Sequence, residues 1–135
     1  MISVSFLILG CLIFVLLGSV HWWSAVRSSK FEPRDDSTLE LMKNGHSKIT
    51  DQSTIWDSVT GFHVSHSVGL IFYGILFITL AVENPRYLYF STVLTAFLLL
   101  LPVLYIVLAQ KYWFSLPRNG FMIAFLLVVF SVVLR

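Results

Sequence analysis

The sequence predicts an all-α integral membrane protein with a four-helix transmembrane bundle, and both composition and apolar segments indicate this class. Of the 135 residues, 57% are hydrophobic and 12% are charged, whereas a typical soluble domain has about 25% charged residues. A helix rises about 1.5 Å per residue, so roughly 20 apolar residues cross a bilayer core. We expect helices at about 2–26, 54–82, 87–110 and 116–134 in a single transmembrane domain, 1–135.

The first apolar segment, 2–20, is expected to be a retained helix rather than a cleaved signal peptide. No basic residue precedes it, and no small-residue cleavage pattern follows it. His21, Trp22 and Trp23 follow instead. Paired indoles are typical of the membrane interface, where an amphipathic ring contacts both lipid and water.

The polar segment 27–53 is expected to form a capping loop with a short amphipathic surface helix. Ser37 and Glu40 fit a capping box, in which each side chain bonds the backbone amide of the other residue. Gly45 is placed to end this helix, since glycine is common at helix C-termini. The segment is therefore predicted to be partly ordered.

The remaining helix boundaries follow from polar residues and prolines. Thr50 or Ser53 is expected to cap the second span, and residues 83–86 form a polar turn after it. Pro102 lies inside the third span, where it removes one backbone hydrogen bond and predicts a kink that a neighbouring group must compensate. Ser115 is expected to cap the fourth span.

The distribution of basic residues predicts the orientation in the membrane. With four spans, the first and third connections lie on one side, whose basic residues are Arg27, Lys30, Arg34, Lys43, Lys48, Lys111 and Arg118. The other side holds Arg86 and Arg135. Because cytoplasmic loops carry an excess of Lys and Arg, we expect a multi-pass inner-membrane protein with both termini outside the cytoplasm. The net charge of +2 is too small and dispersed to suggest nucleic acid as a partner.

Three of the four histidines are candidate site residues because this topology brings them to the cytoplasmic side. His21 ends the first span, and His63 and His66 share a face at the start of the second. Imidazoles bind zinc, copper and iron, so this set could hold a metal or haem, or relay protons. Histidines at an interface can also simply bond headgroups, water or carbonyls, and the sequence leaves both interpretations open. His46 is expected to be a solvated loop residue.

Small residues recur every fourth position at Gly61, Ser65 and Gly69. Such a stripe lets helices approach closely, so we expect it to contact another helix of the chain or a second copy. The single cysteine, Cys11, excludes an intrachain disulfide and is expected to be an apolar filler. The sequence contains no HExxH or CxxC motif and no nucleophile elbow, so no catalytic set is recognisable.

Polar motifs in a fixed order carry a resemblance that extends from about Gly18 to Phe125. They read Phe31-x-Pro33-Arg34-Asp35, Thr50-x-Gln52-Ser53-Thr54-x-Trp56, Gly61-Phe62-x-x-Ser65-His66-Ser67-x-Gly69 and Tyr112-Trp113-Phe114. In these motifs the chain resembles an uncharacterised family of small bacterial inner-membrane proteins with four predicted helices and no established activity. The family commonly has asparagine where this chain has His63, which makes His66 the stronger candidate.

The resemblance implies that the 27–53 loop belongs to the fold. Arg34, Asp35, Gln52 and Trp56 would then pack over His66 as a cytoplasmic cap. The sequence thus favours a binding or accessory protein with a polar, histidine-containing pocket, acting with the lipid bilayer, a membrane protein partner or a homo-oligomer. The alternative is a cofactor protein or enzyme that uses a metal, haem, quinone or lipid, and a small-solute transporter is third.

Overall fold

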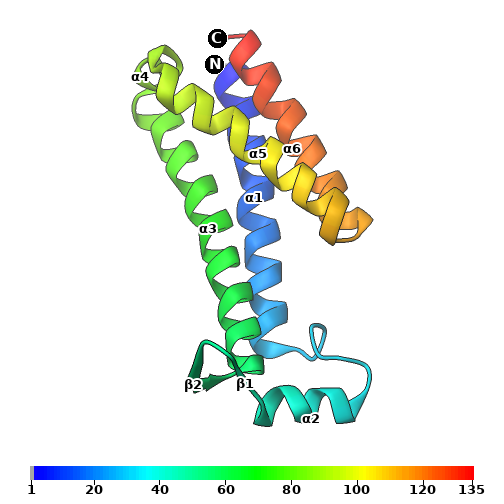
Figure 1. The fold of residues 1–135 in the computed structure, drawn as a ribbon. Coiled ribbons are helices and arrows are strands. Elements are labelled where there is room, and N and C mark those ends of the chain that lie inside the picture. Colours follow the sequence, from blue (N-terminus) through cyan, green and yellow to red (C-terminus); the bar gives the residue numbers. More distant parts are fainter. Residues whose placement is uncertain (1) are drawn as a thin grey trace. The chain divides into compact units, whose positions relative to one another are not determined.

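The computed structural model describes residues 2–135 and is predominantly helical (Figure 1). Its elements are α1 (Ile2–Arg27), α2 (Asp36–Asn44), β1 (His46–Ser47), β2 (Thr50–Thr54), α3 (Ile55–Glu83), α4 (Pro85–Phe90), α5 (Thr92–Tyr112) and α6 (Ser115–Val133). Four of these helices, α1, α3, α5 and α6, are long and apolar enough to cross a membrane. The predicted class, an all-α membrane protein with four spans, is confirmed.

The third span differs from the prediction at its start. We expected one helix over 87–110, but the chain forms the short helix α4 and then begins α5 at Thr92. The Asn84 side chain accepts a hydrogen bond from the Tyr87 amide at 3.1 Å, and the Ser91 hydroxyl accepts one from the Leu94 amide at 3.3 Å. Each polar side chain caps a new helix, so Ser91 separates two helices where hydropathy alone indicated one.

The surface helix α2 is present, but its cap is two residues earlier than predicted. Asp35, not Ser37, is the N-cap, and its carboxylate accepts a bond from the Thr38 amide at 3.0 Å. The hydroxyls of Ser37 and Thr38 donate to the same oxygen at 2.7 and 2.6 Å. Three donors on one ionised oxygen favour Asp35 over the neutral serine as the cap. Gly45 ends α2 as predicted.

The other two predicted caps are also corrected. Thr54 caps α3, since its hydroxyl accepts a bond from the Asp57 amide at 3.0 Å while Asp57 accepts one from the Thr54 amide at 3.0 Å. Thr50 and Ser53 instead lie in β2, which pairs antiparallel with β1 in a small hairpin that the sequence did not predict. Ser115 is the first residue of α6, after an N-cap with no side-chain bond.

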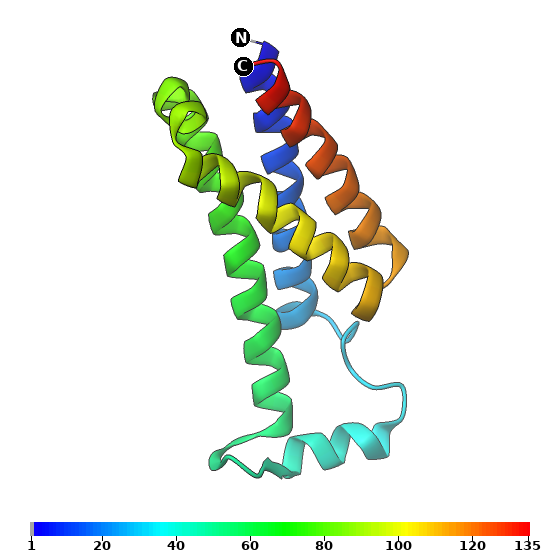
Figure 2. The same cartoon turned by 45° about the horizontal axis from the view of Figure 1, so that its top comes forward.

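The described chain divides into two compact units. Unit 1 comprises residues 2–17 and 70–135, and unit 2 comprises Gly18–Gly69. Helices α1 and α3 contribute to both units. Within unit 1, α6 lies beside the N-terminal part of α1 in two views (Figures 1 and 2). A Cβ built at Gly10 of α1 would lie 3.0 Å from the Ala124 carbonyl oxygen of α6, so a larger residue at position 10 would force α6 to give way slightly.

The core of unit 1 is built around the fully buried Phe14 ring of α1. Its centroid lies 4.6 Å from Tyr73 of α3, 5.1 Å from Phe121 of α6 and 6.0 Å from Tyr105 of α5. Aromatic pairs at these separations stabilise a core beyond their buried area. One side chain thus joins four spans.

Pro102 interrupts the hydrogen bonds of α5, and a neighbouring helix compensates. Proline has no N–H to donate to the carbonyl four residues earlier, which is that of Leu98. The buried Tyr73 hydroxyl donates to this Leu98 oxygen at 2.7 Å. The predicted compensation by a neighbour is therefore confirmed, and the kink itself stays a prediction.

The stripe of small residues on α3 does not pack as expected in the described part of the chain. A Cβ built at Gly61 or Gly69 meets no atom within 4 Å, and Ser65 is exposed. The close approach occurs at Gly74, where a Cβ would lie 2.5 Å from Val15 and 2.7 Å from the Cys11 carbonyl oxygen. The predicted contact with another helix of the same chain is therefore wrong for this stripe.

Candidate functional site

Unit 2 brings together the three histidines that the sequence singled out. His21 lies near the end of α1, and His63 and His66 lie in the first half of α3. All three side chains are half-buried. Residues 42 or more positions apart thus meet because α1 and α3 run side by side in this unit (Figure 1).

The contact between His21 and His63 is a direct hydrogen bond. Nε2 of His21 lies 3.0 Å from Nδ1 of His63. The ring centroid of His21 is 5.1 Å from that of His63 and 5.2 Å from that of His66, and the latter pair is edge-on. The three imidazoles therefore form one cluster.

Two phenylalanines complete the cluster, and neither was predicted as a site residue. Phe31 stacks on His63, with ring centroids 4.3 Å apart and planes 18° apart, and lies 4.7 Å from His21. Phe62 stacks on His66 at 6.3 Å. A large aromatic residue within the polar 27–53 loop is the signal that could have identified Phe31. These five residues are called the histidine–phenylalanine cluster below.

The His21–His63 bond determines what this pair can do chemically. One ring nitrogen donates and the other accepts, so at least one of the two bonding nitrogens carries no proton. When both rings are imidazolium, neither nitrogen can accept, and two like charges face each other. The pair can therefore take up one proton while keeping its contact, and a second proton breaks it.

A shared metal site is less well supported than the sequence suggested. Within residues 2–135, no group of three or more His, Cys, Asp or Glu side chains is placed to hold a metal ion. The His21 and His63 nitrogens that face each other are already engaged in their mutual bond. The donor set therefore does not fit a three-histidine metal centre in this arrangement.

The other predicted site residues belong to unit 2 but have separate surroundings. Arg34, Asp35 and Gln52 are exposed, and Trp56 is half-buried in the first turn of α3, with Lys43 Nζ 6.0 Å from its ring. The pKa of Asp35 is lowered because the Thr38 and Ser37 hydroxyls and the Thr38 amide donate to its carboxylate. The Asp35 carboxylate thus caps the N-terminus of α2. The packing of these residues over His66 stays a prediction.

His46, expected to be solvated, is exposed on β1, and its Nδ1 lies 3.1 Å from the Ser53 carbonyl oxygen. It belongs to the hairpin contacts of unit 2 and is not among the stacked rings. It therefore serves as a control histidine in the experiments below.

A scan against protein-family models, a search of curated proteins and a search of solved structures found no match to this chain. Function is therefore inferred from the residues of the cluster. The chain is a membrane protein with four candidate spans whose distinctive chemical feature is its histidine–phenylalanine cluster.

Proposed function

We propose that this protein is a small membrane binding or accessory protein, and that its histidine–phenylalanine cluster is the binding surface. The supporting observation is the hydrogen bond of 3.0 Å between His21 and His63, with Phe31 stacked on the pair. Polar ionisable groups in membrane helices are costly and usually functional. The hydrophobic packing of the spans would be served equally well by apolar residues at these positions.

The ring arrangement favours binding over catalysis. A general acid or base needs a ring nitrogen that gives a proton to a substrate or takes one from it, whereas the facing nitrogens of His21 and His63 are bonded to each other. Phe62 is 67% exposed beside His63 and His66. An exposed aromatic ring next to half-buried imidazoles offers apolar contact and hydrogen bonding together, which suits a partner helix that carries a polar group.

The proposed orientation places this surface at the cytoplasmic side of an inner membrane, with both termini outside. It is supported by the excess of Lys and Arg in the first and third connections. A reporter fused after Arg135 should be active only outside the cytoplasm. Activity of a cytoplasmic reporter at this position would reverse the orientation.

Site-specific photo-crosslinking in native membranes tests the binding proposal. A photoreactive amino acid at Phe62 should give one defined protein adduct, either a second copy or another membrane protein. The same probe at Phe97, which is 63% exposed on α5 in unit 1, is the matched control and should give lipid adducts only. The adduct from position 62 should disappear with His66→Ala and remain with His46→Ala.

The alternative is a cofactor protein in which His21, His63 and His66 hold a metal or haem. Purified protein with a haem absorption band, or with stoichiometric metal that is lost in His66→Ala, would support this alternative. Combined with equal lipid labelling at positions 62 and 97, that result would reject the binding proposal.

A further inference from the structure

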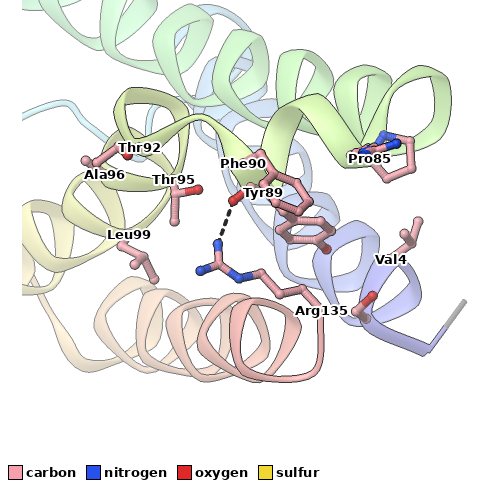
Figure 3. A pocket seen from close by; sticks show the side chains of 11 residues that line it. Val4, Pro85, Tyr89, Phe90, Thr92, Thr95, Ala96, Leu99 and Arg135 are labelled. Atoms are coloured by element: carbon pink, nitrogen blue, oxygen red, sulfur yellow. Dashed lines mark hydrogen bonds between the residues drawn. The ribbon is translucent and has the colours of Figure 1, made fainter.

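Unit 1 contains a cavity of about 850 Å³ whose lining differs from that of the histidine–phenylalanine cluster (Figure 3). Residues from the start of α1, from α4, from the first half of α5 and from the end of the chain line it. The lining includes Ser3, Arg86, Phe90, Ala96, Leu99 and Arg135. The volume is typical of small-molecule sites, which measure about 300–1,000 Å³.

The position of the cavity places it at the ends of candidate spans. Ser3 lies in the first turn of α1, Ala96 in the first turns of α5, and Arg135 directly follows α6. A helix of this length crosses the hydrocarbon core, so its ends lie at the level of the lipid headgroups. An occupant at this position meets headgroups at one end and acyl chains at the other.

The charged side chains of the lining are both basic. Arg86 and Arg135 line the cavity, and none of the described lining residues has an acidic side chain. Nη1 of Arg135 donates to the Tyr89 carbonyl oxygen at 2.6 Å, as the dashed line in Figure 3 shows. The hydroxyl oxygen of Tyr89 in turn lies 2.5 Å from Oγ of Ser131, and the two hydroxyls share a hydrogen bond. Arg135 is thus positioned by one of its five N–H donors, and the planar guanidinium suits phosphate oxygens.

The rest of the lining is predominantly apolar. The Leu99, Ala96 and Phe90 side chains face the cavity in Figure 3, and hydroxyls of Ser3 and Thr95 lie among the lining residues. An inorganic anion would contact the arginines and leave this apolar surface uncovered. A ligand with an anionic head and a hydrocarbon chain matches both parts.

We propose that this cavity binds an anionic phospholipid. Its phosphate contacts Arg86 and Arg135, and the upper part of one acyl chain lies against Leu99 and Phe90. Charge complementarity selects an anionic over a zwitterionic headgroup, since the two guanidinium groups attract a headgroup with net negative charge. The site is independent of the histidine–phenylalanine cluster and of the binding function proposed for it.

Native mass spectrometry of the delipidated full chain tests this inference. The protein is mixed with equal amounts of short-chain phosphatidylglycerol and phosphatidylcholine in neutral detergent. Wild type should retain phosphatidylglycerol preferentially. Arg135→Gln and Arg86→Gln should each reduce this preference about tenfold, the effect of losing one charge-assisted hydrogen bond. Arg27→Gln removes a guanidinium from unit 2 and should leave the preference unchanged. Ala96→Phe should reduce lipid binding although both arginines remain.

Several outcomes would overturn the proposal. Equal retention of the two lipids by wild type would do so, as would an equal loss of preference in Arg27→Gln. Displacement of the lipid by equimolar glycerol phosphate would identify a site for a soluble anion instead. Should Arg135→Gln lose helical content, the exposed Arg86 provides the deciding variant.

Discussion

The two units of this protein are stabilised by different kinds of contact. All the buried hydrophobic side chains among residues 2–135 lie in unit 1, with Phe14 at their centre. The buried side chains of unit 2 are the small polar ones of Ser24 and Ser67, and α2 buries none. Unit 2 relies instead on hydrogen bonds, helix caps and stacked rings.

This difference shows that the ionisable side chains of the candidate site lie in the unit with the fewer buried apolar contacts. Regions with few buried apolar contacts open most easily, and functional surfaces are commonly drawn from them. The histidine–phenylalanine cluster lies in such a region, whereas unit 1 holds the buried apolar core. Substitutions in the buried core of unit 1 should therefore affect the whole fold, and those in unit 2 should act locally.

Phe14→Ala should have the largest effect because it removes the ring that joins the spans of unit 1. Deleting a buried phenylalanine costs about 3–5 kcal/mol of unfolding free energy. Phe97→Ala, at an exposed ring on α5, should change it by less than about 0.5 kcal/mol. Denaturation in mixed micelles measures both variants, and equal effects would contradict the distinction between core and lipid-facing rings.

Gly74→Ala tests the close approach of α3 to α1. Its Cβ would lie 2.7 Å from the Cys11 carbonyl oxygen, so the backbone must move, at a cost of about 1–3 kcal/mol. Gly69→Ala, five residues earlier on α3, meets no atom within 4 Å and should be neutral or slightly stabilising. The same micelle denaturation assay compares the pair, and destabilisation by Gly69→Ala alone would reject the packing described for unit 1.

Tyr73→Phe should remove the donor that satisfies the Leu98 carbonyl and should cost about 1–3 kcal/mol. In a Pro102→Ala background the residue at 102 supplies its own N–H, so the same change should cost less. A double-mutant cycle of unfolding free energies measures the difference. Strict additivity would show that the hydroxyl does not compensate for proline.

His63→Ala should destabilise unit 2 without unfolding unit 1. It leaves a half-buried ring nitrogen of His21 without this partner, at a cost of about 1–2 kcal/mol. Hydrogen exchange should accelerate in the adjoining parts of α1 and α3 and stay slow in α5 and α6. His46→Ala is the control, and faster exchange throughout the chain would contradict the local effect expected in unit 2.

The smallest effect concerns pH at α2. The pKa of Asp35 is lower in the folded chain than its usual 3.8, so the ionised form stabilises the α2 cap. This contribution is complete above the unfolded pKa and is lost as pH falls through the folded pKa. The protection of α2 amides, taken relative to the intrinsic exchange rate at each pH, should therefore fall in acid, and Asp35→Asn should abolish that fall. An unchanged pH profile in Asp35→Asn would assign the effect to another group.

Sequence reasoning predicted the spans better than their boundaries. The span length follows from bilayer thickness and composition, which do not depend on tertiary contacts. Helix caps depend on which neighbouring polar side chain reaches a backbone amide. For this reason Asp35, and not Ser37, caps α2, and α4 ends before Ser91 although hydropathy predicted one continuous helix. The pairing of β1 with β2 was likewise not predicted, because the turn between these strands contains no strong hairpin motif.

The candidate site was predicted in part. The spacing of His63 and His66 on one helix indicated their shared face, and the topology placed His21 near them. The His21–His63 bond depends on the register between α1 and α3, which local sequence does not specify. Phe31 was missed because the position of a loop ring is determined only after the helices have met. The arginine-lined cavity was missed for a similar reason, since Arg86 and Arg135 are far apart in the sequence.

The bond from Tyr73 to the Leu98 carbonyl also has a consequence for biosynthesis. An isolated α5 would enter lipid with one backbone oxygen lacking its helical donor, which is costly in hydrocarbon. Because ribosomes make α3 before α5, the phenol that satisfies this oxygen is already in the membrane when the later span arrives. Tyr73→Phe should therefore slow the insertion of α5, although every residue of α5 itself is unchanged.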